Sequence, residues 1–399
     1  MPVSATARRT PLPVLLHTLF FVLAATQTAI VPLLPRLSHT YGLTPTSSAL
    51  LLAAPGVATL AISLPAGLFA DRLGARRLTV SAAGLAALSA VAQAMPSYPM
   101  LVAGRLAFGL AFGMIWTTGV AWLSSAHGEA GSPRLGAVAT SAAVGMTAGP
   151  ALGGVLTDQL GVAAPFALVA GLTAILAAML WRQPGAARVP TLARDALAQL
   201  ARHAPRSHGV VNGACVLAIT GAVGGVTQLL VPLVLHGAGF SASATGVVFS
   251  ASAGVYIVVS AAAVRLGRRV TTVRATAMAG LALALSLLPA ALSASTVVVI
   301  AVLLISTAPR AVASTVAYPL ATDAAALSGL GDGVVIGLLN GTWAMGLVLA
   351  PLVAGFVDQG FGPQLAFAST VAPGVLIGLW LLVRPVGALS AAEPAVAGV

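Results

Sequence analysis

Residues 67–77 read G-L-F-A-D-R-L-G-A-R-R and carry four of the chain's few charges between two long apolar runs. A shorter version, R-L-G-R-R, occupies residues 265–269 and follows the eighth apolar run. This recurrence indicates that the two halves of the chain repeat one plan.

The composition is that of a membrane protein. Of the 399 residues, 58% are hydrophobic and 7% are charged, and the mean hydropathy is +1.01, whereas charged residues supply about a quarter of a soluble domain. We count twelve apolar runs, each near the roughly 20 residues that a transmembrane helix needs. The runs lack strict alternation, which favours helices over a β-barrel. The sequence therefore predicts an all-α membrane protein with twelve transmembrane helices.

The distribution of arginine predicts the orientation. All 19 basic residues are arginine. With the N-terminus inside, sixteen of them fall on the cytoplasmic side, Arg36 falls outside, and Arg105 and Arg310 fall within spans. This pattern follows the positive-inside rule. The net charge of +11 therefore indicates topology and no nucleic-acid partner. We expect a multi-pass protein of the cytoplasmic (inner) membrane with both termini in the cytosol.

The same residues exclude several kinds of chemistry. Lysine is absent, so no G-x-x-x-x-G-K-[ST] loop exists through which ATP could drive this chain. Cys215 is the sole cysteine, which excludes internal disulfides and thiolate metal clusters. The six histidines show no H-E-x-x-H motif and no i, i+4 pairing on one helix. We therefore predict no metal site, no cofactor and no catalytic residues.

Two pairs of segments support the repeat. T-Q-T-A-I-V-P-L at residues 26–33 matches T-Q-L-L-V-P-L at residues 227–233, and G-P-A-L-G-G-V-L-T-D-Q at residues 149–159 matches A-P-L-V-A-G-F-V-D-Q at residues 350–359. The members of each pair lie about 200 residues apart. Two parallel six-helix repeats are the arrangement of one large class of transporters.

The longest loop between apolar runs divides the chain at its middle. We predict an N-terminal six-helix bundle at residues 1–181, a cytoplasmic linker at residues 182–209, and a C-terminal six-helix bundle with a short tail at residues 210–399. A short basic helix at residues 191–203 is suited to lie along the membrane surface.

These features resemble the major facilitator superfamily, and most closely its twelve-span drug/proton antiporter branch. The family's loop motif, G-x-x-x-D-R-x-G followed by basic residues, matches Gly67, Asp71, Arg72, Gly74, Arg76 and Arg77. Ala75 departs from it, because a first basic residue is usual there. The resemblance implies the major facilitator fold and a loop that holds the cytoplasmic side against the eleventh span. The alternative is that these arginines only fix the topology.

Two further motifs support the resemblance. The fourth span contains G-R-L-A-F-G-L-A-F-G from Gly104, similar to the family's second motif, with Arg105 as its arginine. The fifth contains G-M-T-A-G-P-A-L-G-G, similar to the motif of exporters, which includes Gly145, Gly149, Pro150, Gly153 and Gly154. Glycine at every fourth position favours close helix packing whether or not the protein is an exporter, and proline can bend the helix.

Two arginines lie inside predicted spans, where each costs about 2.5–3.5 kcal/mol on the insertion scale. In the family the first, fourth, seventh and tenth spans are implied to line a central cavity, which would place Arg105 and Arg310 there. The alternative is that each arginine donates hydrogen bonds to carbonyls of a neighbouring helix.

Other polar or aromatic side chains are weaker cavity candidates. Trp116 shares a helical face with Arg105, and Gln27 and Gln228 hold matching places in the repeat. The eleventh span adds Asn340 and Trp343. Helix packing, or hydrogen bonding between helices, is the alternative for each of them.

None of the eight acidic residues lies in mid-span. If protons are exchanged, Asp323 at the cytoplasmic end of the tenth span is our first candidate and His17 is our second, and a solvated helix end is the alternative for both. Proton coupling thus follows from the resemblance alone. Two cavity arginines without acids favour a substrate that has negative charge or strong hydrogen-bond acceptors.

We therefore predict a monomeric secondary transporter in the lipid bilayer that exports a small organic compound by alternating access, in exchange for protons. Proton-coupled uptake of an organic anion is the alternative. A membrane sensor or enzyme is a lesser one, because the sequence shows no large extramembrane domain and no catalytic acid cluster.

Overall fold

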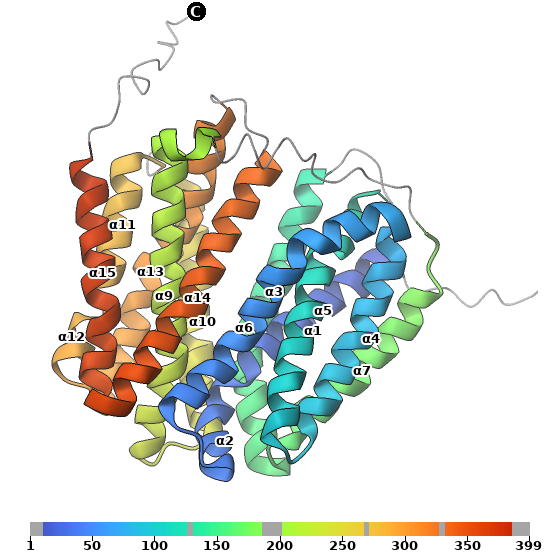
Figure 1. The fold of residues 1–399 in the computed structure, drawn as a ribbon, viewed down its shortest axis with the longest axis horizontal. Helices are drawn as coiled ribbons and strands as arrows, with labels where there is room; N and C mark the ends of the chain where they lie inside the picture. The colour runs from blue at the N-terminus through green and yellow to red at the C-terminus, as the bar shows by residue number, and fades with distance from the viewer. Residues whose placement is uncertain (1–10, 126–130, 186–201, 267–270, 327–331, 385–399) are drawn as a thin grey trace, which may run out of the picture. The chain divides into compact units, whose positions relative to one another are not determined.

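The computed structural model describes residues 11–125, 131–185, 202–266, 271–326 and 332–384. All regular elements in these ranges are helices (Figure 1). Their bounds are α1 (Leu12–Ala29), η1 (Val31–Leu33), α2 (Leu34–Tyr41), α3 (Pro45–Leu73), α4 (Ala75–Ala94), α5 (Tyr98–Ser125), α6 (Gly131–Leu160), α7 (Ala163–Trp181), η2 (Ala204–Arg206), α9 (His208–Gly237), α10 (Ala242–Leu266), α11 (Val273–Leu285), α12 (Leu288–Leu292), α13 (Thr296–Ala326), α14 (Asp332–Phe361) and α15 (Pro363–Val383).

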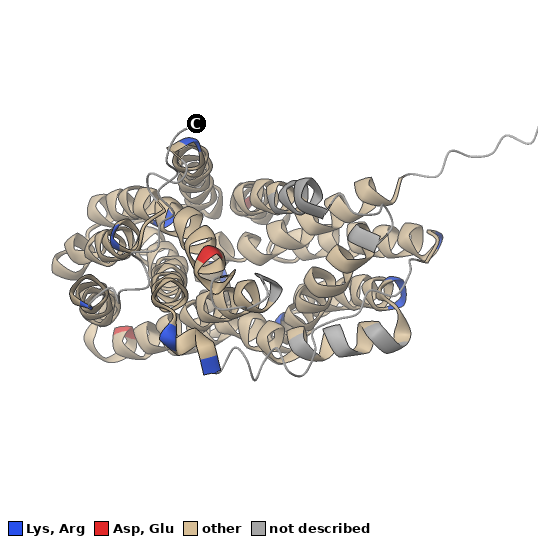
Figure 2. Cartoon of the chain, turned by 90° about the horizontal axis from the view of Figure 1, so that it is seen from above, with Lys and Arg blue, Asp and Glu red and all other residues tan. Residues whose placement is uncertain are grey.

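By length and composition, 11 helices among the described residues can cross a membrane, with α1 to α2 and α11 to α12 each counted as one. The remaining long helix is α6. Together these helices confirm the predicted all-helical membrane architecture. Charged residues are sparse along the helices (Figure 2).

The chain packs into two compact units. The first contains residues 1–191 and 228–254, and the second contains residues 192–227 and 255–399. The end of α9 and the first half of α10 therefore pack within the first unit, although the sequence repeat assigns them to the second half. The predicted bundles 1–181 and 210–399 with linker 182–209 stay a prediction, and most of that linker lies outside the described residues.

In the first unit, α1 packs along α6, α3 packs along α5, and α4 lies between α5 and α7. Its core is formed by large apolar side chains that are fully or almost fully buried, among them Leu16, Phe20, Phe108 and Trp122. In the second unit, α11 packs against α13 and α15, and α14 also packs on α15. There α9 meets α14 closely, because Gly221 abuts the carbonyl of Trp343.

The glycine stripe of α6 lies directly on the backbone of α1. A Cβ at Gly145, Gly149 or Gly153 would collide with the carbonyls of Phe21, Ala25 or Ala29, respectively. On another face, a Cβ at Gly154 would collide with the carbonyl of Ala242 in α10. The close packing expected from the sequence is therefore present, and α6 is held between two helices by residues that have no side chain.

Gly149 gives a test of this packing. In the Gly149→Ala variant the new methyl group would strike Thr28 Oγ1 and the Ala25 carbonyl. We expect a loss of about 1–3 kcal/mol of stability, the usual cost of overpacking, measured as a lower melting temperature of the purified protein in detergent.

The matched control for this test is Gly171→Ala on α7, where an added Cβ meets nothing within 4 Å. Replacing glycine by alanine inside an exposed helix is neutral or stabilises by up to about 1 kcal/mol. An equal fall in melting temperature for both variants would contradict the contact between α6 and α1.

Candidate functional site

Arg105 on α5 is fully buried, with 0% of its surface exposed. Its Nε donates a long hydrogen bond of 3.4 Å to the carbonyl of Leu51 on α3, and its guanidinium carbon lies 5.5 Å from the centre of the Phe108 ring. Pro55, four residues after Leu51, has no N–H, so the Leu51 carbonyl is without its usual helical donor. Arg105 supplies that donor. This contact is the alternative stated above, in which the arginine donates to a carbonyl of a neighbouring helix.

The two terminal nitrogens of Arg105 are buried and have no hydrogen-bond partner among the described residues. Buried polar atoms without partners are rare in folded proteins. A role of Arg105 in the substrate cavity stays a prediction, and in this structure the side chain is fully buried.

Trp116 belongs to an aromatic cluster in the same unit. Its ring centre lies 5.0 Å from that of Phe20 on α1 and 6.0 Å from that of Phe112 on α5. These separations are typical of stabilising aromatic pairs. Trp116 is only half-buried, so the packing role is present and stacking on a substrate stays a prediction.

Arg310 on α13 is half-buried inside the second unit. Its guanidinium carbon lies 5.5 Å from the centre of the Tyr256 ring on α10, within the range of a cation–π contact. A Cβ on Gly224 of α9 would lie 3.7 Å from the Nη1 atom of Arg310, an ordinary van der Waals separation, so the cation lies beside the backbone of α9 at this glycine. The Nε atom is buried without a hydrogen-bond partner among the described residues.

A second polar pair lies further along α13. The hydroxyl of Tyr318 donates a hydrogen bond of 2.6 Å to Oδ1 of Asn340 on α14. Sequence reasoning selected Arg310 and Asn340 but missed Tyr256 and Tyr318. Both could have been selected as tyrosines within apolar runs, because a buried tyrosine hydroxyl usually has a hydrogen-bond partner.

The remaining cavity candidates are not brought together by any contact in the described residues. Gln27 on α1 and Gln228 on α9 are both half-buried. Trp343 on α14 packs against the apolar cluster that includes Leu217 and Leu339. Their roles stay predictions.

The two proton candidates have different surroundings. Asp323 is exposed near the end of α13, whereas His17 on α1 is half-buried, with its Nδ1 atom 3.2 Å from the hydroxyl of Ser141 on α6. Within the described residues there is no group of three or more histidine, cysteine or acidic residues that could hold a metal ion.

The charged stretch at residues 67–77 spans the end of α3 and the start of α4. Gly74 between them has φ +88°, which favours glycine, and its N–H donates to the carbonyl of Ala70. Arg76 donates to the Trp181 carbonyl at the end of α7 and lies over the ring of Trp181, and Arg77 is exposed. The side chains of Asp71 and Arg72, and the surroundings of Gly67, lie outside the described residues. The predicted hold on the eleventh span therefore stays a prediction.

Pro150 changes the hydrogen bonding of α6, and two hydroxyl groups compensate. The carbonyl of Met146 has no N–H from Pro150 to accept, and the Thr28 hydroxyl on α1 lies 3.2 Å from it. One residue further, Ser250 on α10 donates to the Thr147 carbonyl at 2.7 Å and accepts from the Ala151 N–H at 3.2 Å. A hydroxyl is thus inserted into one step of the helix, a recognised cause of helix bending. Sequence reasoning missed Thr28 and Ser250.

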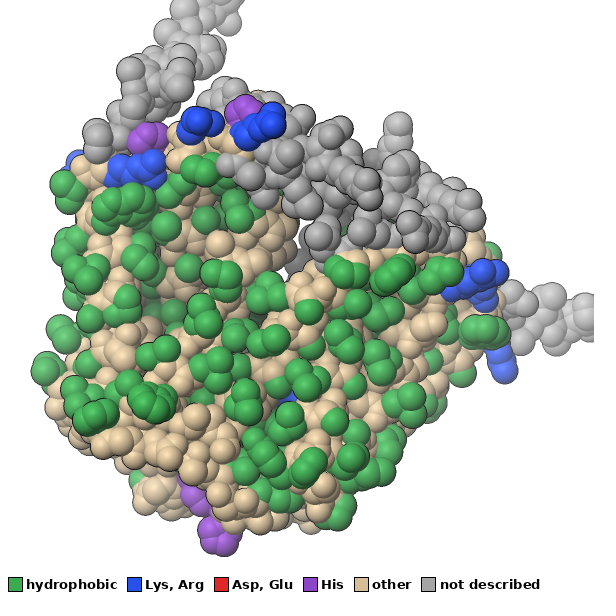
Figure 3. Space-filling view, viewed as in Figure 1, with side chains coloured by type: hydrophobic (Ala, Val, Ile, Leu, Met, Phe, Trp, Pro, Cys, Tyr) green, Lys and Arg blue, Asp and Glu red, His purple; other side chains and the backbone are tan. Residues whose placement is uncertain are grey.

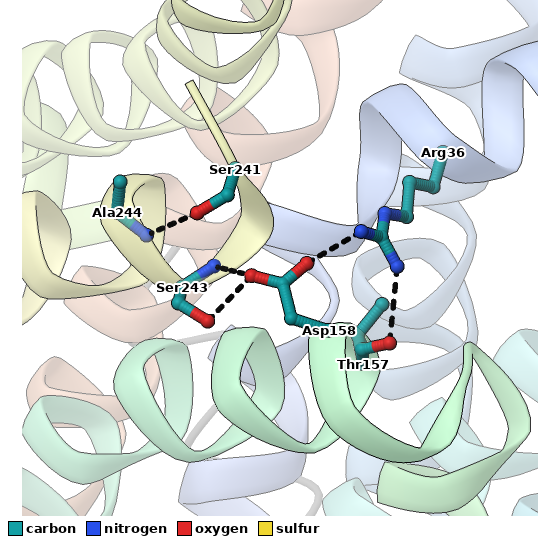
Figure 4. A network of polar contacts seen from close by, with 6 residues as sticks. All are labelled: Arg36, Thr157, Asp158, Ser241, Ser243 and Ala244. Atoms are coloured by element: carbon teal, nitrogen blue, oxygen red, sulfur yellow. Dashed lines mark hydrogen bonds and ion pairs between the residues drawn. The ribbon is translucent and has the colours of Figure 1, made fainter. Parts of the chain in front are cut away.

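Asp158 is the centre of a polar network at the end of α6 (Figure 4). One carboxylate oxygen pairs with Arg36 on α2 at 2.6 Å. The other accepts from the hydroxyl of Ser243 and from its backbone N–H at 2.7 Å. Arg36 also donates to the Thr157 carbonyl at 3.0 Å. Because α10 begins at Ala242, Asp158 caps the first turn of that helix with a negative charge.

The network determines the protonation of Asp158. Partial burial by itself would raise the pKa of this carboxyl, but the two hydrogen bonds from Ser243 and the charge of Arg36 outweigh it and hold the pKa below its usual value. Sequence reasoning placed Arg36 and Asp158 on the outer side but assigned no role to either.

Comparison with known proteins identifies the family. The model of the Major Facilitator Superfamily matches residues 16–334. The chain belongs to the major facilitator superfamily. Two curated relatives, each named MFS-type transporter ppzB, are 34% identical over 122 residues in Metarhizium majus and over 124 residues in Metarhizium rileyi. These matches cover 30% of this chain and only about a quarter (26% and 25%) of the relatives' length.

Solved structures confirm the major facilitator fold. A bacterial homologue of the human lysosomal transporter Spinster has a TM-score of 0.73 at 15% identity, over 95% of this chain and 96% of that one. A D-xylose-proton symporter has a TM-score of 0.71 at 16% identity, over 93% of this chain and 95% of that one. The human organic anion transporter TETRAN has a TM-score of 0.64 at 20% identity, over 93% of this chain and 100% of that one. The chain therefore has the major facilitator fold over nearly its whole length.

The Asp158 network generates a test. We expect the Asp158→Asn variant to lose about 1–2 kcal/mol of stability at pH 7, because hydrogen bonds to a charged group contribute about 1.5–3 kcal/mol and partial exposure lowers this value. Asp358→Asn is the matched control, since Asp358 holds the repeated position and forms no ion pair among the described residues.

The pH dependence of this stabilisation follows from the lowered pKa of Asp158. The contribution is fully present above the pKa of the unfolded chain and is lost as the pH falls through the lower folded value. The difference in melting temperature between the wild type and Asp158→Asn should therefore shrink as the pH is lowered into the acid range. A constant difference down to pH 3 would show that the carboxylate charge is not what stabilises the network.

Proposed function

We propose that this protein is a secondary transporter of the drug/proton antiporter branch, which exports a small organic compound across the cytoplasmic membrane in exchange for protons. It works by alternating access as a monomer, with both termini in the cytosol. The charged stretch at residues 67–77 stabilises the state closed to the cytoplasm. The proposal for export is supported by the resemblance of residues 145–154 to the exporter motif.

One observation supports the substrate class. Arg310 is a half-buried cation inside a membrane-spanning unit, and among the described residues no carboxylate pairs with it. The groups beside it are the ring of Tyr256 and the backbone of Gly224. The buried Nε of Arg310 has no hydrogen-bond partner among the described residues, and such a guanidinium suits a compound that offers hydrogen-bond acceptors or negative charge. Asn340 and Tyr318 would add neutral polar contacts.

The same arginine favours the second candidate, proton-coupled uptake of an organic anion. One protein of similar fold is described as an organic anion transporter. That likeness concerns the fold, so the direction of transport must be measured.

Arg310 provides the test of the substrate site. We expect the Arg310→Ala variant to reduce counterflow of anionic or acceptor-rich compounds about 10- to 100-fold, because a hydrogen bond to a charged group contributes about 1.5–3 kcal/mol. The assay uses proteoliposomes and a compound panel, at equal protein content. Arg265→Ala, at the exposed end of α10, is the control and should transport normally. Unchanged counterflow in Arg310→Ala would exclude this site.

The direction and the coupling ion are tested with imposed pH gradients. Accumulation of the compound in vesicles that are acidic inside is expected for exchange with protons, whereas anion entry driven by outside acid would establish uptake instead. Asp323→Asn should abolish the gradient-driven movement and preserve counterflow, because only the proton step is removed. If Asp323→Asn retains gradient-driven transport, the same assay on His17→Gln decides between the two candidates.

A further inference from the structure

A groove runs between α11 and α15 in the second unit, and its lining includes none of the residues proposed above for the substrate site. It has a volume of about 540 Å³, within the roughly 300–1,000 Å³ range of small-molecule sites. Most of its lining is apolar, and two arginines also line it. The main side chains are Arg274, Met278, Ala282, Leu285, Leu382 and Arg384.

Glycines shape this groove. At Gly378 and Gly374 of α15, an added Cβ would lie 2.9 Å from the Leu281 Cβ and 2.8 Å from the Ala284 Cβ on α11. The two helices therefore meet closely through these small residues. Alongside this contact, Met278, Leu285 and Leu382 remain exposed, so the apolar wall of the groove faces the surroundings of the bundle, which in a membrane are acyl chains.

The two arginines lie at the same end of the groove. Arg274 is in the first turn of α11 and is exposed, and Arg384 follows the last residue of α15. The guanidinium carbon of Arg384 lies 5.1 Å from the centre of the Trp380 ring, which restricts its position. Neither arginine forms an ion pair among the described residues. At the upper ends of α11 and α15, basic side chains border a surface of hydrophobic ones (Figure 3).

We propose that this groove is a binding site for an anionic phospholipid. The headgroup phosphate lies between Arg274 and Arg384, and one acyl chain occupies the groove along Met278, Ala282 and Leu285. Both helices begin or end at this level, so the arginines stand at the membrane interface, where long basic side chains reach the headgroups. Basic pockets between transmembrane helices are suited to anionic headgroups. Neutral phospholipids share the acyl chain but lack the net charge that two unpaired arginines favour.

The test uses the full chain, purified in a neutral detergent, with lipid binding measured by native mass spectrometry. Phosphatidylglycerol and phosphatidylcholine with identical acyl chains are titrated. We expect the wild type to prefer phosphatidylglycerol, and the double variant Arg274→Gln with Arg384→Gln to bind it roughly 30-fold more weakly, since each arginine near a membrane surface contributes about a fivefold effect. Arg265→Gln removes one exposed arginine outside the groove and should change the affinity less than twofold.

Ala282→Trp tests the groove without changing charge and also decides the question if the double variant does not fold. The indole fills the acyl-chain path, and we expect binding of phosphatidylglycerol to fall at least fivefold. Unchanged binding in this variant would overturn the proposal. The proposal would also fail if Arg265→Gln weakened lipid binding as much as the double variant does. Equal binding of the two lipids would contradict it as well, and so would complete displacement of the lipid by inorganic phosphate at equal concentration.

Discussion

Backbone hydrogen bonding in lipid is the constraint on which this structure depends. A transmembrane helix satisfies its own N–H and C=O groups, but proline lacks the N–H that would bond the carbonyl four residues earlier. Pro55 and Pro150 each lie inside a membrane helix of the first unit. The carbonyls that they leave without a helical donor, Leu51 and Met146, are met by Arg105 and Thr28 from neighbouring helices. These polar contacts join helices that apolar packing alone would leave free to slide.

Close approach through glycine makes such contacts possible. Thr28 reaches α6 because Gly149 leaves no Cβ between the two backbones. Gly246 has the same role against Pro150, where an added Cβ would strike the proline carbonyl, and this places Ser250 of α10 within reach of Thr147 and Ala151. Small residues and hydroxyl groups thus act together around α6, as is expected where helices associate by packing and hydrogen bonds in lipid.

The few charges divide into distinct environments. Asp158 and Arg36 neutralise each other and cap α10. Arg105 is fully buried and donates to a carbonyl of α3, while Arg310 is half-buried beside Tyr256 and Gly224. Two arginines that look alike in the sequence therefore have different surroundings.

The sequence by itself determined the helical membrane architecture, the close packing of α6 and the absence of mid-span acids, because apolar length, glycine spacing and residue type are local properties. The resemblance of the charged stretch also led to the correct superfamily. Only the tertiary structure decided which carbonyl Arg105 meets, that Tyr256 lies against Arg310, and that Asp158 caps α10. These contacts join residues that are between about 50 and 90 positions apart. Such contacts depend on how closely whole helices approach, which a single sequence does not specify residue by residue.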